Sequence, residues 1–333
     1  MNKIVFIGER LFMKYGELEY FKSRLEDVNG QAVSTRDMTE REIIEAAEDA
    51  AAVVTIAGRV SRELMERAKN LRFIMTLSVG YDCVDVEAAS ELGIPVSNCP
   101  VYCTDDVANH AMTLLLAVSR KLHMIIPAVQ DGTFGYEYTK PILNYRGRKL
   151  GILGLGKIGR TIVPKARGFG MNVAAYDPYV DDDIFEMLGV ERKYELDDLV
   201  SDVDYLTVHS LLTRETRGIL GLEEFRKMKE HAVVVNTARG PIIDEEALAV
   251  ALEEGMIAGA GIDVFSSEPP GADHPLIRSP KTIITPHIAW YSEKSFEANM
   301  VQGMDELTRV LSGHRPRHIV NPGIFGTTYK NHS

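Results

Sequence analysis

The stretch Lys149-Leu-Gly-Ile-Leu-Gly154-Leu-Gly156-Lys-Ile-Gly159, followed by Val173-Ala-Ala-Tyr-Asp177, decides the fold of this chain. A short apolar strand leads into Gly-x-Gly-x-x-Gly, a helix follows, and a second apolar strand ends at an acidic residue. This order of strand, glycine turn, helix and acid is the dinucleotide-binding fingerprint in the context that it requires. The stretch therefore predicts a Rossmann-type unit that begins in mid-chain.

Each part of the fingerprint has a predicted role. Gly154 permits the tight turn, Gly156 lets the backbone approach a pyrophosphate, and Gly159 lets the helix pack on the strand. The first helical turn offers free N–H groups to the phosphates. Asp177, about 20 residues further on, would accept hydrogen bonds from an adenosine ribose. Because no Arg or Lys lies beside Asp177 to neutralise a 2′-phosphate, NAD is favoured over NADP.

Length and charge limit the function classes. The 333 residues suffice for two domains, and 45% apolar with 26% charged residues is a globular composition. The net charge of −11 argues against nucleic acid or an anionic membrane as the main partner. No apolar run approaches the roughly 20 residues of a membrane helix, so we expect a cytoplasmic location.

The three cysteines, Cys83, Cys99 and Cys103, form no disulfide framework. Cys99 and Cys103 have no matching second pair, so we predict no metal site, and two buried thiols are favoured over a redox switch.

The first hundred residues alternate strand and helix, which indicates a parallel α/β sheet. The predicted strands are Ile4–Ile7, Ala32–Ser34, Ala52–Ile56, Phe73–Leu77 and Pro95–Ser97, with helices at Glu40–Glu48, Arg62–Lys69 and Val86–Glu91. Five strands predict a small flavodoxin-like domain.

A long helix is predicted next, over Thr104–Lys121, with Thr104 as its N-cap. Because Val107 to Val118 is apolar on nearly every side, we expect this helix to be buried all round, as a linker between domains or between subunits. The segment Asp131–Arg148 is irregular and rich in Gly and Tyr, which suggests an arm that embraces a partner subunit in a homodimer.

The second α/β unit is expected over roughly Leu150 to Trp290. Its six predicted strands are Leu150–Leu153, Asn172–Tyr176, Asp204–Val208, Ala232–Asn236, Gly259–Val264 and Thr282–Thr285. The tail contains one helix, Phe296–Leu311, which we expect to cross back to the first domain. The fold class is therefore α/β, with two Rossmann-like domains: a discontinuous flavodoxin-like substrate domain, residues 1–100 plus 291–333, and a doubly wound NAD-binding domain inserted into it, residues 101–290.

Three ionisable residues fall just beyond strand ends, where open parallel sheets bind ligands. Arg239 can bind a substrate carboxylate with its planar fork. His287 can protonate the alkoxide that forms as hydride arrives, and Glu268 can fix the tautomer of the imidazole. Together these residues point to reduction of a 2-oxo acid.

The chain resembles the D-isomer-specific 2-hydroxyacid dehydrogenase family over nearly its whole length. The resemblance rests on Leu77-Ser78-Val79-Gly80-Tyr81-Asp82, Asn98-Cys99-Pro100, the glycine fingerprint, Asn236-Thr-Ala-Arg239-Gly240, Gly261-Ile-Asp263-Val-Phe, Glu268-Pro269 and Thr285-Pro286-His287. Two further tracts, Tyr102 to His110 and Ala289 to Glu293, look most like the branch of the C-terminal-binding-protein co-repressors and their bacterial relatives.

The resemblance implies roles for these residues. Arg239 would bind the substrate's carboxylate and carbonyl, and Glu268 and His287 would be the acid/base pair. Backbone amides of Ser78, Val79 and Gly80 would hold the substrate carboxylate. The implied cofactor contacts are Asp263 with the nicotinamide carboxamide, Thr237 and Ala238 along the ring, and the amides of Lys157 and Ile158 with the pyrophosphate.

Two positions depart from the family pattern or leave alternatives open. His209 would lie close to the cofactor, but Leu211 stands where the family usually has Pro, which makes this contact less secure. Trp290, the single tryptophan, could wall the substrate pocket and favour an apolar or thioether side chain over glyoxylate, or could simply pack under its loop.

The sequence therefore predicts an NAD-dependent enzyme that acts on a small 2-hydroxy or 2-oxo acid of D stereochemistry. The alternative is an NAD(H)-sensing regulatory protein that resembles the co-repressors. A phosphoglycerate dehydrogenase with a regulatory domain is disfavoured because the sequence ends soon after the last helix. Formate dehydrogenase is rejected because it carries Gln where this chain has Glu268.

Overall fold

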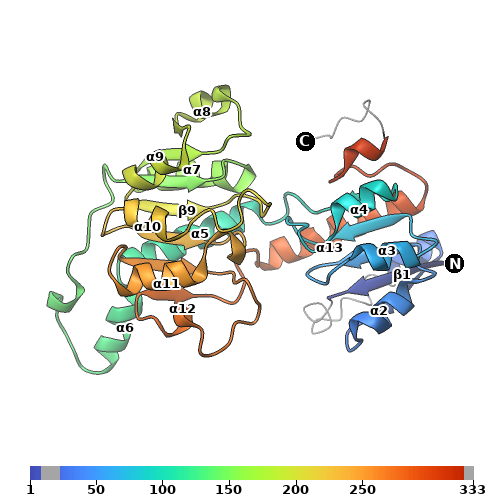
Figure 1. Cartoon of the computed structure of the whole chain (residues 1–333), viewed down its shortest axis with the longest axis horizontal. Coiled ribbons are helices and arrows are strands. Elements are labelled where there is room, and N and C mark those ends of the chain that lie inside the picture. The colour runs from blue at the N-terminus through green and yellow to red at the C-terminus, as the bar shows by residue number, and fades with distance from the viewer. Residues whose placement is uncertain (9–22, 326–333) are drawn as a thin grey trace. The chain divides into compact units, whose positions relative to one another are not determined.

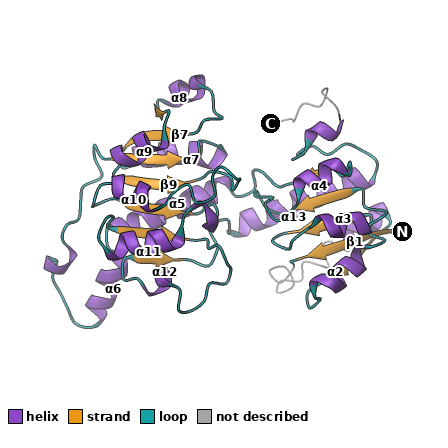
Figure 2. Ribbon diagram, in the orientation of Figure 1, coloured by secondary structure: helices purple, strands orange, loops and turns teal. Residues whose placement is uncertain are grey.

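A computed structural model describes residues 1–8 and 23–325 of the chain. It divides into two compact units, Met1–Tyr102 with Glu293–Ser333, and Cys103–Ser292 (Figure 1). Each unit is built on one sheet with helices alongside it (Figure 2). The fingerprint lies wholly in the second unit, so the two units are described separately.

The first unit has a five-stranded parallel sheet of order β2-β1-β3-β4-β5. The strands are β1 (Asn2–Ile7), β2 (Gly30–Ser34), β3 (Ala52–Thr55), β4 (Phe73–Thr76) and β5 (Val96–Ser97). The helices are α2 (Glu40–Ala47), α3 (Arg62–Arg67), α4 (Val86–Glu91) and α13 (Glu293–Leu311), with 3-10 turns η2 (Glu26–Val28) and η5 (Pro322–Phe325). The order 2-1-3-4-5 is flavodoxin-like, which confirms the predicted fold class.

The C-terminal helix α13 belongs to this first unit. Met300, Met304 and Leu307 pack in the same core as Phe73 and Met75. Gly303 allows the close approach, since a Cβ there would lie 2.0 Å from Leu77 Cδ2. The side chain of Asn321 then donates to Ile94 O and accepts from Val96 N, which ties the end of the described chain to β5. The chain thus returns to the first sheet after building the second.

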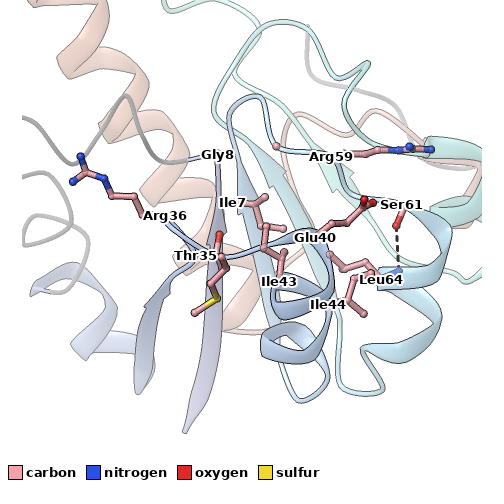
Figure 3. A pocket seen from close by; sticks show the side chains of 12 residues that line it. Ile7, Gly8, Thr35, Arg36, Glu40, Ile43, Ile44, Arg59, Ser61 and Leu64 are labelled. Carbon is pink, nitrogen blue, oxygen red and sulfur yellow. Dashed lines mark hydrogen bonds between the residues drawn. The ribbon is translucent and has the colours of Figure 1, made fainter. Parts of the chain in front are cut away.

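A cavity of about 420 Å³ lies at the carboxyl ends of β1, β2 and β3 (Figure 3). Its floor is apolar and is formed by Ile7, Ile43, Ile44 and Leu64. In Figure 3 the guanidinium groups of Arg36 and Arg59 extend outward rather than toward one another. Without converging polar groups the cavity does not specify a ligand.

The second unit has a seven-stranded parallel sheet of order β12-β11-β10-β9-β6-β7-β8. Its strands are β6 (Lys149–Leu153), β7 (Asn172–Tyr176), β8 (Glu191–Lys193), β9 (Tyr205–Val208), β10 (Val233–Asn236), β11 (Gly259–Ile262) and β12 (Thr282–Ile284). Counted from β6 along the chain, the sheet order is 3-2-1-4-5-6-7, the Rossmann order with one strand added.

The prediction of six strands was wrong by one, because β8 was missed. Its sequence Glu-Arg-Lys carries no apolar pattern. Only parallel pairing with β7, over Ala174 to Tyr176, makes it a strand. Edge strands of this kind are short and charged, and so they escape a search for apolar runs.

Eight helices and two 3-10 turns occur in the described second unit. They are α5 (Thr104–Ser119), α6 (Leu122–Gln130), α7 (Lys157–Gly168), α8 (Asp182–Leu188), α9 (Leu196–Asp202), α10 (Leu222–Lys227), α11 (Glu245–Glu253), α12 (Pro275–Arg278), η3 (Glu137–Thr139) and η4 (Gly240–Ile242), with α13 in the first unit completing the α series.

Four expectations for the long helix α5 were wrong. Its N-cap is Cys103, with no side-chain hydrogen bond, so Thr104 is the first helical residue and not the cap. The helix ends at Ser119, and Lys121 is left-handed. It is not buried all round, since Asn109 and Thr113 are exposed. Its apolar face packs on β10, β11 and α7, so α5 covers the second sheet as an integral helix of that unit and not as a linker between domains. A position between subunits stays a prediction.

Helix α6 and the segment after it expose apolar side chains. Leu122, Met124, Ile126 and Val129 are exposed on α6, and Phe134 is 96% exposed. The segment 131–148 is irregular apart from η3. Within the described residues, no single helix is long and apolar enough to cross a membrane, although α5 and α6, bent by 60°, reach that level when taken together.

Candidate active site

In the glycine turn between β6 and α7, two of the three glycines have no room for a side chain. Gly154 has φ of +96°, and a Cβ there would lie 2.5 Å from Ser210 N. A Cβ on Gly159 would lie 2.3 Å from Gly154 O. Nothing lies within 4 Å of the Cβ position of Gly156, the N-cap of α7. Protein atoms therefore fill the space beside Gly154 and Gly159. The space beside Gly156 is open, so that a ligand's phosphates could approach the backbone there.

Asp177 follows β7 and faces this turn. One carboxylate oxygen accepts from Leu155 N at 2.8 Å, within the glycine turn, and the other accepts from Tyr179 N at 3.0 Å. Each oxygen keeps a second lone pair for another donor. The first turn of α7 begins at Lys157 and Ile158, whose N–H groups have no partners inside the helix. The Asp177 carboxylate and the free amides of Lys157 and Ile158 thus lie around the open space beside Gly156.

Three buried polar atoms on neighbouring loops have no hydrogen-bond partner in the described chain. They are His209 Nδ1, Ser210 Oγ and Thr237 Oγ1. The other ring nitrogen of His209 bonds Thr207 Oγ1 at 2.7 Å. Burial lowers the pKa of His209 to about 3, so the ring is neutral at physiological pH. Buried polar atoms are normally satisfied, and those left over mark where a polar ligand binds.

The loop after β10 is organised by Asn236. Its side chain accepts from Ala238 N at 3.0 Å and donates to Arg239 O at 2.8 Å. Gly240 then lets the loop abut the next one, since a Cβ there would lie 2.0 Å from Phe265 C. This contact brings Arg239 close enough for its charge to act on Glu268.

His287 and Glu268 form a direct pair, with 2.6 Å between His287 Nδ1 and Glu268 Oε2. The other oxygen of Glu268 accepts from Phe265 N at 2.9 Å, which fixes the carboxylate plane. Burial raises the pKa of Glu268, but the hydrogen bond and charge of His287, the Phe265 amide and Arg239 outweigh it, so that the pKa lies below its usual value. A charged carboxylate accepts, so Nδ1 carries a proton and Nε2 is the nitrogen left for a substrate.

Asp263 holds the loop that carries His287. Its side chain is fully buried and accepts from Thr285 Oγ1 at 2.5 Å, Ile288 N at 3.0 Å and Ala289 N at 2.9 Å. Three donors on one carboxylate leave little capacity for a further ligand. The structure therefore gives Asp263 a role in holding the loop that the sequence did not reveal, beside the predicted cofactor contact.

Trp290 lies on the same loop and is partly buried. Its indole Nε1 donates to His287 O at 3.0 Å, and its ring packs edge-on against Tyr291. These contacts agree with a packing role for the ring. Its part in selecting a substrate side chain stays a prediction.

In the first unit, the turn after β4 presents backbone amides. Each carbonyl oxygen from Leu77 to Gly80 accepts a hydrogen bond from within the unit. The donors are, in chain order, Asn299 Nδ2, Cys99 N, Asn98 Nδ2 and Ser78 Oγ. No acceptor in the described chain is present for the N–H groups of Ser78, Val79 and Gly80. A turn with its carbonyls tied back and its amides free is suited to an anion.

Residues 112–289 match the family model described as D-isomer specific 2-hydroxyacid dehydrogenase, NAD binding domain. The chain belongs to this dehydrogenase family. The second unit is therefore its NAD-binding domain, and NAD is the cofactor. The resemblance inferred from the motifs is confirmed for the family, while its placement near the co-repressor branch stays a prediction.

Relatives of known name differ in activity. The chain is 39% identical over 298 residues to D-3-phosphoglycerate dehydrogenase of Methanocaldococcus jannaschii, covering 89% of this chain and 56% of the relative. It is 35% identical over 290 residues to glyoxylate reductase of Korarchaeum cryptofilum, covering 86% and 87%. The D-lactate dehydrogenase of Aquifex aeolicus, solved with NAD and lactic acid, has a TM-score of 0.85 at 25% identity, covering 96% and 99%. The chain spans little more than half the length of the first of these relatives.

The glycine turn and its surroundings fit NAD. The open position at Gly156 suits a pyrophosphate, and the unpartnered atoms of His209, Ser210 and Thr237 suit a polar ligand that extends along the strand ends. In the loop where Leu211 stands in place of Pro, Thr216 Oγ1 donates to Leu211 O at 2.5 Å.

Sequence reasoning missed the residues that hold the site in shape. Asn98 and Asn236 stand in motifs that were recognised, but no role was inferred for them. Asn299, His110 and Thr285 gave no signal of their hydrogen-bond partners, because those partners lie far away in the sequence.

Proposed function

We propose that this chain is an NAD-dependent D-2-hydroxyacid dehydrogenase that also works as a 2-oxo acid reductase. The observation that carries the proposal is the His287–Glu268 pair at 2.6 Å, which leaves Nε2 as the proton-transfer atom. Arg239 beside it supplies a permanent positive charge for a carboxylate. When bound, NAD supplies the hydride acceptor or, as NADH, the hydride donor.

The chain's own residues perform the remaining tasks. In the reduction, His287 Nε2–H donates its proton to the substrate's C2 oxygen, and Glu268 stabilises the imidazolium before transfer. Arg239 binds the substrate carboxylate and polarises the carbonyl. The free amides of Ser78, Val79 and Gly80 in the first unit would bind a substrate carboxylate.

The cofactor residues take the roles that the sequence suggested. Gly154, Gly156 and Gly159 shape the turn, Lys157 and Ile158 offer amides to the pyrophosphate, and Asp177 accepts from the ribose. Thr237, Ala238 and His209 line the site, and Asp263 adds its remaining lone pair to the carboxamide.

A panel of 2-oxo acids tests the function, with NADH oxidation as the readout. Glyoxylate, hydroxypyruvate, pyruvate, a longer apolar 2-oxo acid and 3-phosphohydroxypyruvate cover the side chains of the named relatives and the preference suggested by Trp290. Turnover on one of them, abolished by His287→Ala or Arg239→Ala with NADH binding kept, supports the proposal. Absence of turnover on all, together with NADH-dependent capture of a protein partner, would instead support the regulatory alternative.

We also propose that the chain forms a homodimer through α6 and residues 131–148. The exposed side chains of Ile126, Val129 and Phe134 lie on this one continuous segment. Large exposed apolar groups so close together are typical of an interface. Light scattering should give twice the mass of one chain, and Ile126→Glu with Phe134→Glu should give a monomer. A monomeric wild-type protein would refute the dimer without touching the enzymatic proposal.

A further inference from the structure

A chain of hydrogen bonds runs from α5 to the loop that carries His287. His110 Nε2 lies 3.0 Å from Thr285 Oγ1, and Thr285 Oγ1 lies 2.5 Å from Asp263 Oδ1. His110 Nε2 is itself 3.7 Å from Asp263 Oδ1. His110 and Thr285 are 175 residues apart in the sequence, but both belong to the second unit. None of the chemistry proposed above uses His110.

The direction of these bonds follows from the groups involved. The Asp263 carboxylate accepts from two backbone N–H groups, and the Thr285 hydroxyl donates its single proton to Oδ1 of the same carboxylate. The hydroxyl oxygen then has only lone pairs for His110, and His110 must donate through Nε2–H. Nε2 of His110 therefore carries the hydrogen that is donated to Thr285 Oγ1.

The loop that carries His287 is strained, and it lies at the opposite end of these hydrogen bonds from His110. His287 has φ of +55°, a left-handed conformation that is unfavourable for a residue with a Cβ. Such strain persists only where the surroundings over-determine it. Here Asp263 supplies the restraint, since its backbone carbonyl accepts from His287 N at 2.8 Å while its carboxylate accepts from Ile288 N and Ala289 N.

Thr285 and His110 decide how the Asp263 carboxylate is oriented. Oδ1 accepts from both the Thr285 hydroxyl and Ile288 N, while Oδ2 accepts from Ala289 N. If His110 no longer donates to Thr285, the Thr285 hydroxyl is free to rotate. The Asp263 carboxylate then loses the hydrogen bond that orients it. The loop then relaxes from the geometry that aims Nε2 of His287.

We propose that His110 is a positioning residue, which acts through Thr285 and Asp263 to hold His287 in its left-handed conformation for proton transfer. The proposal rests on the proposed function. A residue of helix α5 would then affect the reaction rate, although α5 supplies no group that touches the substrate.

Two substitutions of His110 separate this role from simple packing. The amide nitrogen of Gln reaches about as far as Nε2 of His, whereas that of Asn reaches only as far as Nδ1. His110→Gln should therefore keep kcat within about threefold of wild type. His110→Asn should lower kcat roughly 10- to 100-fold, the scale of a small misplacement of a reacting group. KM and the Kd for NADH should stay within about threefold in both.

Thr285 provides a second, independent comparison. Thr285→Val removes the hydroxyl at nearly constant volume and should lower kcat as His110→Asn does, while Thr285→Ser should restore it. Thr113→Val, on the exposed face of α5, is the matched control and should leave kcat unchanged. Equal kcat in the Gln and Asn variants, or a rise in KM with unchanged kcat, would overturn the positioning role.

Amide hydrogen exchange measures the restraint on the His287 loop without turnover, so it tests the role of His110 even if the proposed enzymatic function is wrong. The amides of Ile288 and Ala289 should exchange at least tenfold faster in His110→Asn and Thr285→Val than in wild type, whether or not any 2-oxo acid is turned over. Unchanged exchange of these amides would refute the inference. Faster exchange without turnover by the wild-type protein would refute only the enzymatic proposal.

Discussion

Replacement of Glu268 by Gln is the sharpest test of the proton-transfer pair, because the structure dictates how the amide must turn. Phe265 N donates to Oε1 of Glu268 at 2.9 Å, so the single oxygen of a Gln side chain must serve that backbone group. The amide NH2 would then face Nδ1 of His287, where the carboxylate oxygen now lies at 2.6 Å. Nδ1 becomes an acceptor, and the imidazole proton moves to Nε2.

The magnitude follows from the bond that is lost. A hydrogen bond to a charged group contributes about 1.5–3 kcal/mol, which corresponds to roughly 10- to 150-fold in rate at about 1.36 kcal/mol per factor of ten. The two side chains are 39% and 36% exposed, so solvent screening favours the lower end. We expect kcat for reduction to fall about tenfold at neutral pH because the imidazolium is less favoured. Oxidation should fall further because Nε2 can no longer accept a proton.

The assay is steady-state turnover of the best 2-oxo acid, and of its 2-hydroxy product in reverse, between pH 5 and 9. Because the pKa of Glu268 lies below its usual value, the wild-type carboxylate stays charged throughout this range, and the wild-type profile reflects other groups. The profile of Glu268→Gln for reduction should move toward acid by about one pH unit, the equivalent of the tenfold loss. Glu253→Gln, an exposed position at the end of α11, is the charge-matched control.

Two results would refute this reasoning. Unchanged kcat and pH profile in Glu268→Gln would mean that the carboxylate does not hold the imidazole during turnover. Equal losses in both directions with an unshifted profile would mean that Glu268 acts only through folding, and thermal unfolding would then show the same defect.

Three further predictions concern the NAD-binding unit. Gly154→Ala should abolish measurable NADH binding in a fluorescence titration, since the new Cβ would lie 2.5 Å from Ser210 N at φ of +96°; a Kd close to that of wild type would contradict the role of the turn. Asp177→Asn should lower the preference for NADH over NADPH by about tenfold, the equivalent of one charge-assisted hydrogen bond of ~1.5 kcal/mol, and an unchanged ratio of the two Kd values would remove Asp177 from the ribose site. Asp204→Asn should lower the free energy of unfolding by about 1–2 kcal/mol at pH 7, because Lys149 N–H, His231 and Lys229 outweigh burial and lower the pKa of Asp204 to about 2. Urea unfolding should show this difference in full above pH 4 and shrinking as the pH falls toward 2, since a lowered pKa stabilises only while the carboxylate is charged; a difference independent of pH would exclude the charge as its cause.

Local patterns determined much of the architecture from the sequence alone. Short apolar runs between turn residues predicted all five strands of the first sheet. The central strands β1, β3 and β4 are largely apolar because they are buried on both faces. The fingerprint at Gly154 to Gly159 identified the second sheet and its cofactor, since Gly154 and Gly159 leave no room for a Cβ and Gly156 leaves open space for a ligand. Arg239, Glu268 and His287 were found because ligands meet parallel sheets at the carboxyl ends of their strands.

What the sequence did not reveal depends on contacts between distant residues. The strand β8 exists only through its pairing with β7, and α5 proved to cover the second sheet because its apolar face meets β10 and β11. The free amides of Ser78 to Gly80 are available because side chains from Asn98 and Asn299 occupy the carbonyls behind them. The motif of Asp263 predicts a cofactor contact, and the structure adds that its buried carboxylate holds the loop of His287. Residue type and local order therefore determine which groups can do the chemistry, whereas tertiary hydrogen bonds, which no local pattern encodes, decide how those groups are aimed.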